Sequence, residues 1–234
     1  MARKKGKFIT VEGGEGSGKT TQAHLIFDAL NNSGVPAILT REPGGTGGAE
    51  SIRDLLVKGE TGRWDRITET LLYFAARRDH VEKLIKPALE RGEWVVCDRF
   101  TDSTKAYQGY GYGVQLELID GLHKLTIGDF GPDLTLVFDI DVERGLHRSV
   151  SRDEKISEDK KEDRYERMGD VFHKNVRRGF LEVAKANKGR CVVIDASDSI
   201  KEVHAEAVNI VNSRLDQKIS ACSIDEIKEA VGGN

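Results

Sequence analysis

The strongest constraint in the sequence is the phosphate-binding pattern G-x-x-x-x-G-K-T, which runs from Gly13 to Thr20. A short β-branched run over residues 8–12 precedes it, and an amphipathic helical pattern over residues 20–31 follows it. This order of strand, glycine-rich turn and helix lets backbone N–H groups and a helix N-terminus surround phosphate oxygens. The pattern therefore predicts a P-loop for ATP or GTP, the alternative being a glycine-rich hairpin without a ligand.

The side chains of this loop suit a nucleotide and a metal. Lys19 can bridge the β- and γ-phosphates, and the Thr20 hydroxyl can bind Mg²⁺. Asp98 ends an apolar run over residues 94–97, as does the carboxylate that holds the metal through water in P-loop proteins; a carboxylate that caps a helix is the alternative. No guanine-reading N-K-x-D sequence occurs, which favours ATP. The residues expected to contact ATP in this region are Gly13, Gly14, Glu15, Gly16, Ser17, Gly18, Lys19, Thr20 and Thr21.

Strand-like runs alternate with helical patterns along the chain, which predicts an α/β fold with a parallel sheet. The further strand candidates are residues 35–40, 94–97, 134–140 and 191–195. A chain of 234 residues suits one domain, here residues 1–234. A long helix is expected over residues 67–90, kinked or cut by Pro87. Its apolar stripe is expected to contain Leu71, Ala75, Leu84, Ile85 and Leu89.

Composition argues against several classes of protein. The formal net charge of −3 argues against a nucleic-acid-binding protein, which usually needs a basic face. The apolar stretch near the N-terminus is too short for a signal peptide or a membrane span, so a cytoplasmic protein is expected. Cys97 and Cys191 lie in apolar runs, which predicts buried free thiols, and the six histidines show no zinc spacing.

The segment 151–167 is almost entirely polar. One interpretation is a solvated helix face or a disordered loop, which such a composition favours by itself. The other is a mobile lid that carries cations over a phosphate site.

Further motifs give the chain a family resemblance. In this order they are VEGGEGSGKTT, TREPGGT at residues 40–46, YFAAR at 73–77, DRFTDSTKAYQG at 98–109 and PDLTLVFDID at 132–141. Together they resemble the thymidylate kinase family over residues 8–211. The resemblance implies a P-loop NTPase fold with a five-stranded parallel sheet flanked by helices and a small mobile lid. It also implies ATP and dTMP as substrates, Mg²⁺ as cofactor, dTDP as product and a homodimer.

The resemblance also implies roles on the acceptor side. Glu15 would lie near the 3′-hydroxyl of the sugar and the metal. Arg99 would hold the acceptor phosphate with help from Arg41, since planar guanidinium groups form paired bonds to phosphate. Tyr73 would stack on the base, where most relatives have phenylalanine, and Arg77 would donate to a thymine carbonyl.

Other positions follow from the same resemblance. Arg53 would pack over the base, and Tyr107 would crowd the ribose 2′ position and so favour deoxyribose. Ser103, Thr104 and Gln108 would lie near the base edge. The complete set of expected dTMP contacts is Glu15, Arg41, Glu42, Pro43, Arg53, Tyr73, Arg77, Arg99, Ser103, Thr104, Tyr107 and Gln108.

The resemblance favours the lid interpretation for residues 148–167. Members with an acidic residue at the position of Glu15 supply the cation for the transferring phosphate from the lid. Arg148, Arg152 and Lys155 are candidates; we expect Arg152 to act in catalysis and Arg148 to contact ATP. The expected catalytic residues are thus Lys19, Arg99, Arg152 and Glu15. The tail, residues 215–234, lies beyond the resemblance, and its apolar spacing suggests a terminal helix.

Two alternatives to a dTMP kinase remain at this stage. A P-loop kinase for another nucleoside monophosphate would turn over dUMP, dCMP or a ribonucleotide better than dTMP. A nucleotide-switch protein would hydrolyse ATP slowly and use no small acceptor, but it would leave the acceptor-side motifs without a purpose.

Overall fold

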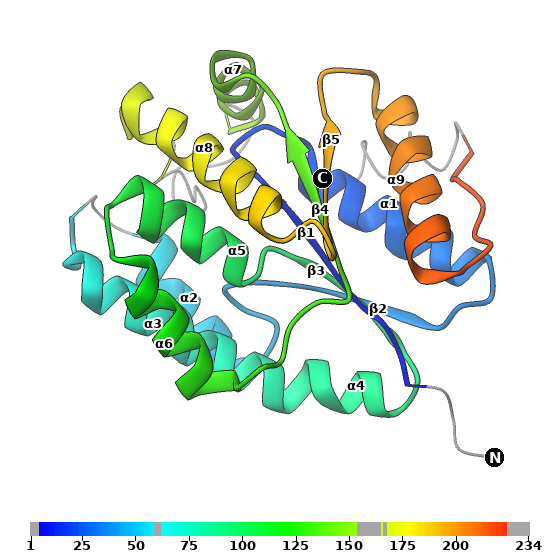
Figure 1. Cartoon of the computed structure of the whole chain (residues 1–234), viewed down its shortest axis with the longest axis horizontal. Coiled ribbons are helices and arrows are strands. Elements are labelled where there is room, and N and C mark those ends of the chain that lie inside the picture. Colours follow the sequence, from blue (N-terminus) through cyan, green and yellow to red (C-terminus); the bar gives the residue numbers. More distant parts are fainter. Residues whose placement is uncertain (1–4, 59–61, 154–164, 166–167, 224–234) are drawn as a thin grey trace.

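The computed structural model describes residues 5–58, 62–153, 165 and 168–223. Five parallel strands form one sheet in the order β2-β3-β1-β4-β5, which confirms the predicted five-stranded parallel sheet (Figure 1). The strands are β1 (Phe8–Gly13), β2 (Ala37–Arg41), β3 (Trp94–Asp98), β4 (Leu134–Asp139) and β5 (Cys191–Asp195). The central strand β1 leads into the phosphate loop, and the loop therefore opens at the carboxyl edge of the sheet, where ligands of α/β proteins bind.

Helices cover both faces of the sheet. The pair α1 and α9 lies together on one side, and the remaining helices lie on the other side and around the carboxyl edge (Figure 1). The helices are α1 (Lys19–Asn32), α2 (Gly47–Val57), α3 (Arg66–His80), α4 (Lys86–Glu90), α5 (Thr101–Thr104), α6 (Leu116–Ile127), α7 (Val142–Asp153), α8 (Asp170–Ala186) and α9 (Ile200–Leu215), with π-helical segments η1 (Val81–Ile85) and η2 (Lys105–Gly111).

The strands are apolar on both faces because both faces are covered. Successive side chains of a strand point to opposite faces. On β1, Ile9 and Val11 accordingly pack with α1 and α9, whereas Phe8 packs with Val95 and Cys97 on the other side. Burial of each such side chain stabilises the fold by roughly 1.5–3 kcal/mol, and this packing fixes the loops at the carboxyl edge.

The predicted long helix is present as α3, η1 and α4 in succession. Pro87 stands at the start of α4, directly after the π-helical segment, in which the Lys86 N–H donates to the Val81 carbonyl. A proline ring clashes with the carbonyl four residues earlier, and the wider turn relieves that clash. The predicted stripe is partly wrong: Leu71 and Ala75 are exposed, because the inward face of α3 carries Phe74 and other buried side chains.

The predicted terminal helix is absent from the part of the tail that the structure describes. Residues 217–223 follow an irregular path across α1 and α9. The side-chain amide of Asn212 bonds to both the N–H and the carbonyl of Ile219, at 2.8 and 2.9 Å, so these backbone groups are used outside any helix. Cys222 is buried near Leu25. Residues 224–234 lie outside the described residues.

The three cysteines, Cys97, Cys191 and Cys222, are free and buried, which confirms the prediction for the first two. Burial raises the pKa of the Cys97 thiol well above its usual value. Among the described helices, none has the length and apolarity needed to cross a membrane.

Candidate active site

The phosphate loop joins β1 to α1 and is built mainly from backbone. Gly16 and Gly18 have φ angles of 64° and 80°, in the left-handed region that glycine adopts readily. Lys19 opens α1 with its side chain mostly buried, and its Nζ donates to the Gly14 carbonyl at 3.4 Å. No side chain in the described part of the chain caps the start of α1, so its first N–H groups can bind an anion. Residues 13–21, all expected to contact ATP, thus form one continuous segment from the end of β1 into the first turn of α1.

The loop touches the start of α7 through backbone atoms. A Cβ added to Gly16 would lie 1.9 Å from the Gly145 carbonyl oxygen, and one added to Gly145 would lie 2.5 Å from the Glu15 carbonyl oxygen. Both positions therefore require glycine. This contact joins the phosphate loop to the helix that carries Arg148.

Thr20 and Asp98 meet where β1 and β3 lie side by side. The Thr20 hydroxyl donates to Asp98 Oδ2 at 2.6 Å, and the other carboxylate oxygen, Oδ1, is buried without a hydrogen-bond partner among the described residues. Mg²⁺ prefers oxygen ligands and keeps several waters, so a hydroxyl, an unpaired carboxylate oxygen and substrate phosphates fit it. Among the described residues, no group of three or more His, Cys, Asp or Glu side chains is arranged so that it could hold a metal ion.

Arg99 and Glu15 meet beside the loop. Arg99 Nη2 donates to Glu15 Oε1 and to the Tyr107 hydroxyl, both at 3.1 Å, and the Tyr107 hydroxyl donates to the same Glu15 oxygen at 2.6 Å. Arg99 Nη1 donates to Ser103 Oγ at 3.1 Å and to the Gly13 carbonyl at 3.3 Å. The structure therefore brings Glu15 together with Arg99 and Tyr107, which lie 84 and 92 residues further along the chain, and all three were predicted for the acceptor site.

This cluster carries charge in a dry environment. Burial opposes ionisation of Glu15, but Lys19 and Arg99 outweigh it and lower the pKa of Glu15 to about 2. Burial also opposes the charge on Arg99, yet Tyr107 and Glu15 raise its pKa further above the usual range. At neutral pH the site therefore holds a carboxylate between two cations, with Lys19 Nζ 3.9 Å from Glu15 Oε2.

A second arginine, Arg77, lies deeper. It is 2% exposed, and its Nε donates to Glu42 Oε2 at 2.7 Å. The other oxygen of Glu42 bonds to His80 Nδ1 at 3.1 Å, and Arg77 Nη2 donates to Thr104 Oγ1 at 3.1 Å. The remaining nitrogen, Nη1, is buried with no partner in the described part of the structure. Such an unpaired donor is costly unless a ligand takes it up.

Tyr73 belongs to a network of hydroxyl and amide groups. Its hydroxyl lies 3.0 Å from that of Tyr165, which donates to Glu69 Oε1 at 2.7 Å. Gln108 Nε2 donates to both Glu69 and Tyr165 at 3.0 Å. Because the Tyr165 proton goes to Glu69, the Tyr73 hydroxyl is the donor to Tyr165. The hydroxyl that distinguishes Tyr73 from phenylalanine thus has a partner.

Arg41 and Arg53 lie at the REPGG turn. Arg41 ends β2 in register with Asp98, but its side chain is 53% exposed and bonds to Glu50 at 3.2 Å. Arg53 reaches from α2 and donates to the Pro43 carbonyl at 2.6 Å. The structure thus places both beside the turn, with Arg41 outside the Arg99 cluster.

The predicted lid is described only at its beginning and at Tyr165. Arg148 Nη1 donates to the Ala196 carbonyl at 3.2 Å, on the loop after β5. Arg152 lies on the last turn of α7, but its side chain and all of Lys155 lie outside the described residues.

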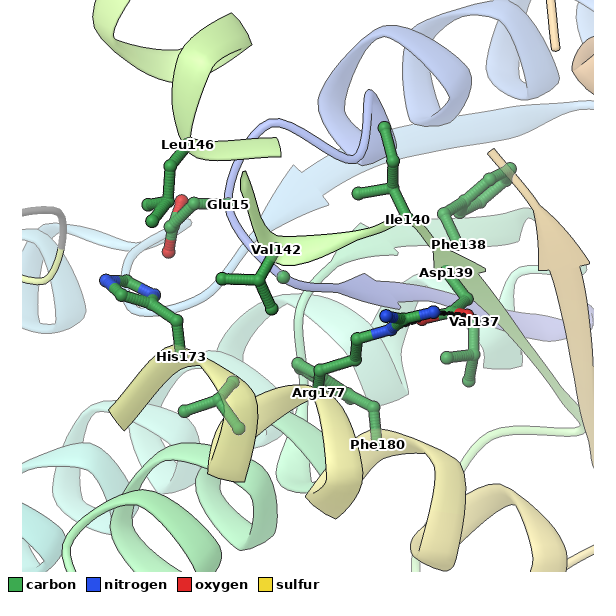
Figure 2. A pocket seen from close by; sticks show the side chains of 12 residues that line it. Glu15, Val137, Phe138, Asp139, Ile140, Val142, Leu146, His173, Arg177 and Phe180 are labelled. Carbon is green, nitrogen blue, oxygen red and sulfur yellow. Dashed lines mark hydrogen bonds and ion pairs between the residues drawn. The ribbon is translucent and has the colours of Figure 1, made fainter. Parts of the chain in front are cut away.

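Figure 2 shows a small pocket between the loop, α7 and α8, bordered by Glu15, Leu146 and His173. Its volume of about 20 Å³ is large enough for one water molecule. The buried Nε2 of His173 has no partner among the described residues. The pocket therefore offers a polar contact beside Glu15.

Sequence reasoning missed Glu69, His80 and the bonding of Tyr165. Each acts through a partner that lies 38 or more residues away, so no local pattern reveals it. The signal available for Glu69 was a charged residue about two helical turns before Arg77, on the side of α3 that is buried.

Comparisons with known proteins agree on one family. A model of the thymidylate kinase family matches residues 11–207. The chain is similar to a thymidylate kinase of Caulobacter vibrioides, 47% identical over 90% of this chain and 98% of that protein. It is also similar to one of Dinoroseobacter shibae, 48% identical over 87% and 95%. The crystal structure of thymidylate kinase from Ehrlichia chaffeensis aligns with a TM-score of 0.67 and 40% identity, covering 88% of this chain and 99% of that one.

Proposed function

The chain belongs to the thymidylate kinase family and phosphorylates dTMP to dTDP with ATP, in the synthesis of dTTP; from this premise we propose how its residues divide the work. The observation that carries the proposal is the Arg99, Glu15 and Tyr107 cluster directly beside the phosphate loop. A partly buried arginine next to a P-loop offers a second phosphate site beside the first, which a phosphotransferase needs.

On the donor side, residues 13–21 wrap the ATP phosphates with backbone N–H groups. Lys19 contacts the β- and γ-phosphates, and Arg148 contacts the nucleotide from α7. Thr20 and Asp98 would hold Mg²⁺, Asp98 through water, and the metal when bound neutralises phosphate charge. The unpaired Asp98 Oδ1 supports this assignment.

On the acceptor side, Arg99 binds the dTMP phosphate, with Arg41 able to assist because its exposed side chain can leave Glu50. Glu15 accepts from the 3′-hydroxyl of the sugar. Tyr107 occupies the space that a ribose 2′-hydroxyl would need. The support is geometric, since Arg99 and Tyr107 both contact Glu15.

The base site lies around Arg77. Its unpaired Nη1 supports a bond to a thymine carbonyl, because a ligand acceptor would satisfy that buried donor. Tyr73 stacks on the ring, and Gln108 and Thr104 line the base edge. Glu42 fixes Arg77 through a 2.7 Å bond, and so sets the direction of the donor.

The reaction needs no general base. The acceptor phosphate, with a second pKa of about 6, is mostly dianionic at neutral pH and is already a nucleophile. Its oxygen attacks the γ-phosphorus of ATP, and the bond to the ADP oxygen breaks. The protein aligns two polyanions and neutralises charge with Lys19, Arg99 and a cation from the lid, for which we propose Arg152.

We further propose a homodimer through α3 and α6, which pack side by side. Their outer surface exposes Ile67 (40%), Leu71 (49%), Leu118 (40%) and Leu125 (81%). Several large apolar side chains exposed on two packed helices favour an interaction site there. Light scattering of the wild type should give twice the chain mass, and Leu71→Glu should give the chain mass; a monomeric wild type would remove this part of the proposal.

The test of the function is ADP release measured across a panel of nucleoside monophosphates. We expect dTMP to give the highest kcat/KM, about tenfold or more above dUMP, since a single methyl group discriminates to about that extent. Better turnover with dCMP or a ribonucleotide would assign a different acceptor. Slow ATP hydrolysis that no monophosphate accelerates would indicate a nucleotide switch.

A further inference from the structure

Glu12, on β1, is a buried carboxylate with no role in the mechanism above. Its side chain is fully buried, and both of its oxygens accept hydrogen bonds. Oε1 accepts from the Phe100 backbone N–H at 2.8 Å, and Oε2 accepts from the Ser103 hydroxyl at 2.5 Å. Both donors follow Arg99 in the sequence: Phe100 is the next residue, and Ser103 lies on α5.

These two bonds hold Arg99 from opposite ends. The backbone of Arg99 has a φ of 70°, a left-handed conformation that is costly for any residue with a Cβ. The Phe100 N–H belongs to the peptide that follows Arg99, so its bond to Glu12 holds that peptide in place. At the other end, Ser103 Oγ accepts from Arg99 Nη1 at 3.1 Å while donating to Glu12.

We propose that Glu12 is a positioning residue for the dTMP phosphate, because one carboxylate fixes both the strained backbone of Arg99 and the direction of its guanidinium. This inference rests on the proposed role of Arg99. The Arg99 guanidinium donates to the Ser103 hydroxyl, and that hydroxyl donates in turn to the Glu12 carboxylate. This arrangement requires an acceptor at both oxygens of residue 12.

Glutamine at position 12 would keep the size and shape of the side chain but would interrupt this series of hydrogen bonds. Its amide nitrogen can only donate, so either the bond with the Ser103 hydroxyl is reversed or the bond from the Phe100 N–H is lost. Burial, together with Asp102, raises the pKa of Glu12 to about 8 against the opposing effects of Ser103 and Arg99. The comparison is therefore made at about pH 9, where the wild-type carboxylate is ionised.

For Glu12→Gln we expect the KM for dTMP to rise about tenfold while the KM for ATP changes less than about twofold, the size expected when a buried charged bond loses one partner. Calorimetric binding of dTMP without ATP should weaken by the same factor. Ser103→Ala should weaken dTMP binding by a smaller factor. It should add nothing to Glu12→Gln, because the two act through one chain of bonds.

Thr10→Val is the matched control. Thr10 lies on the same strand, is fully buried, and bonds through its hydroxyl to Thr135 at 2.7 Å. Loss of this hydroxyl bond should lower the Tm and leave the KM for dTMP unchanged. This separates a change of position at Arg99 from a general loss of stability in β1.

The outcomes are distinguishable. Wild-type dTMP binding by folded Glu12→Gln, or an equal rise in both KM values, would overturn the inference. If that variant does not fold, Ser103→Ala decides: selective weakening of dTMP binding supports the inference, and unchanged binding overturns it. A wild type that phosphorylates no dTMP would instead overturn the proposed function, and the inference with it.

Discussion

The donor and acceptor halves of the site are made from different materials. The phosphate loop presents backbone groups and one lysine, and that lysine bonds to a carbonyl of the loop itself. The acceptor half presents side chains, the buried Arg77 and the partly buried Arg99, each fixed by partners from other parts of the chain. A backbone site is encoded by a few adjacent residues, whereas a side-chain site is encoded by the whole fold. The two halves should therefore respond differently to mutation.

Lys19→Ala should have the largest effect on activity and little effect on stability. The side chain neutralises charge on the transferring phosphate, so we expect kcat to fall about a thousandfold. Among its contacts are those to the Gly14 carbonyl at 3.4 Å and to Glu15 at 3.9 Å; both are long, so the Tm should change little. Steady-state kinetics and thermal unfolding check this; near-normal turnover would remove Lys19 from the mechanism.

Arg77→Leu should reduce both activity and stability, which is the contrast with Lys19. It removes the proposed thymine donor, for which we expect about a hundredfold loss in kcat/KM. It also leaves Glu42 buried without its 2.7 Å partner, a change that costs about 3 kcal/mol of unfolding free energy. The neighbouring exposed Arg78→Leu is the control, and it should be nearly neutral. Equal stability of the two variants would show that the acceptor half is not held by this ion pair.

Arg152→Ala tests a lid cation that belongs to neither the donor half nor the acceptor half of the site. If the lid supplies it only when both substrates are bound, kcat should fall about thirtyfold while the Kd for dTMP stays the same. Single-turnover kinetics with calorimetry separate the two quantities. An unchanged kcat would mean that another lid cation, Arg148 or Lys155, acts in catalysis. Replacing each of these two residues by alanine would then show which one it is.

Tyr73→Phe should have the smallest effect. The ring is kept, so stacking on the base persists, while the bond from the Tyr73 hydroxyl to Tyr165 at 3.0 Å is lost. We expect a change of less than about threefold in the KM for dTMP, with a slightly lower Tm. A larger loss of affinity would mean that the hydroxyl itself contacts the ligand.

Local patterns predicted the elements that local physics determines. The five strands, the phosphate loop and the helix after it are correct, because alternation, glycine spacing and helical periodicity each act over a few residues. The contact between Thr20 and Asp98 follows from the adjacent strands β1 and β3. The stripe on α3 was wrong at Leu71, because an apolar residue on the outer surface looks the same in sequence as one in the core.

The details of the acceptor half could not be predicted, for a physical reason. Glu42 pairs with Arg77 and His80, which lie 35 and 38 residues further along the chain, and only the packing of α3 against the sheet brings them together. Arg41 carries the same charge as Arg99, yet its position at the sheet edge leaves it exposed beside Glu50. Residue type suggested a phosphate ligand in both cases, whereas burial depends on tertiary structure.

The backbone contact between Gly16 and Gly145 has a consequence for how this sequence can vary. Gly145 bears no side chain and takes part in no step of the reaction, yet any larger residue there would press on the Glu15 carbonyl. In a library of random variants, selected in cells whose growth depends on the activity of this enzyme, position 145 should accept as few substitutions as the phosphate loop. If position 145 accepts no substitution although it lies outside the phosphate-binding motif, the reason is steric, because there is no room for a side chain. The start of α7 could then change in sequence only when the phosphate loop changes with it.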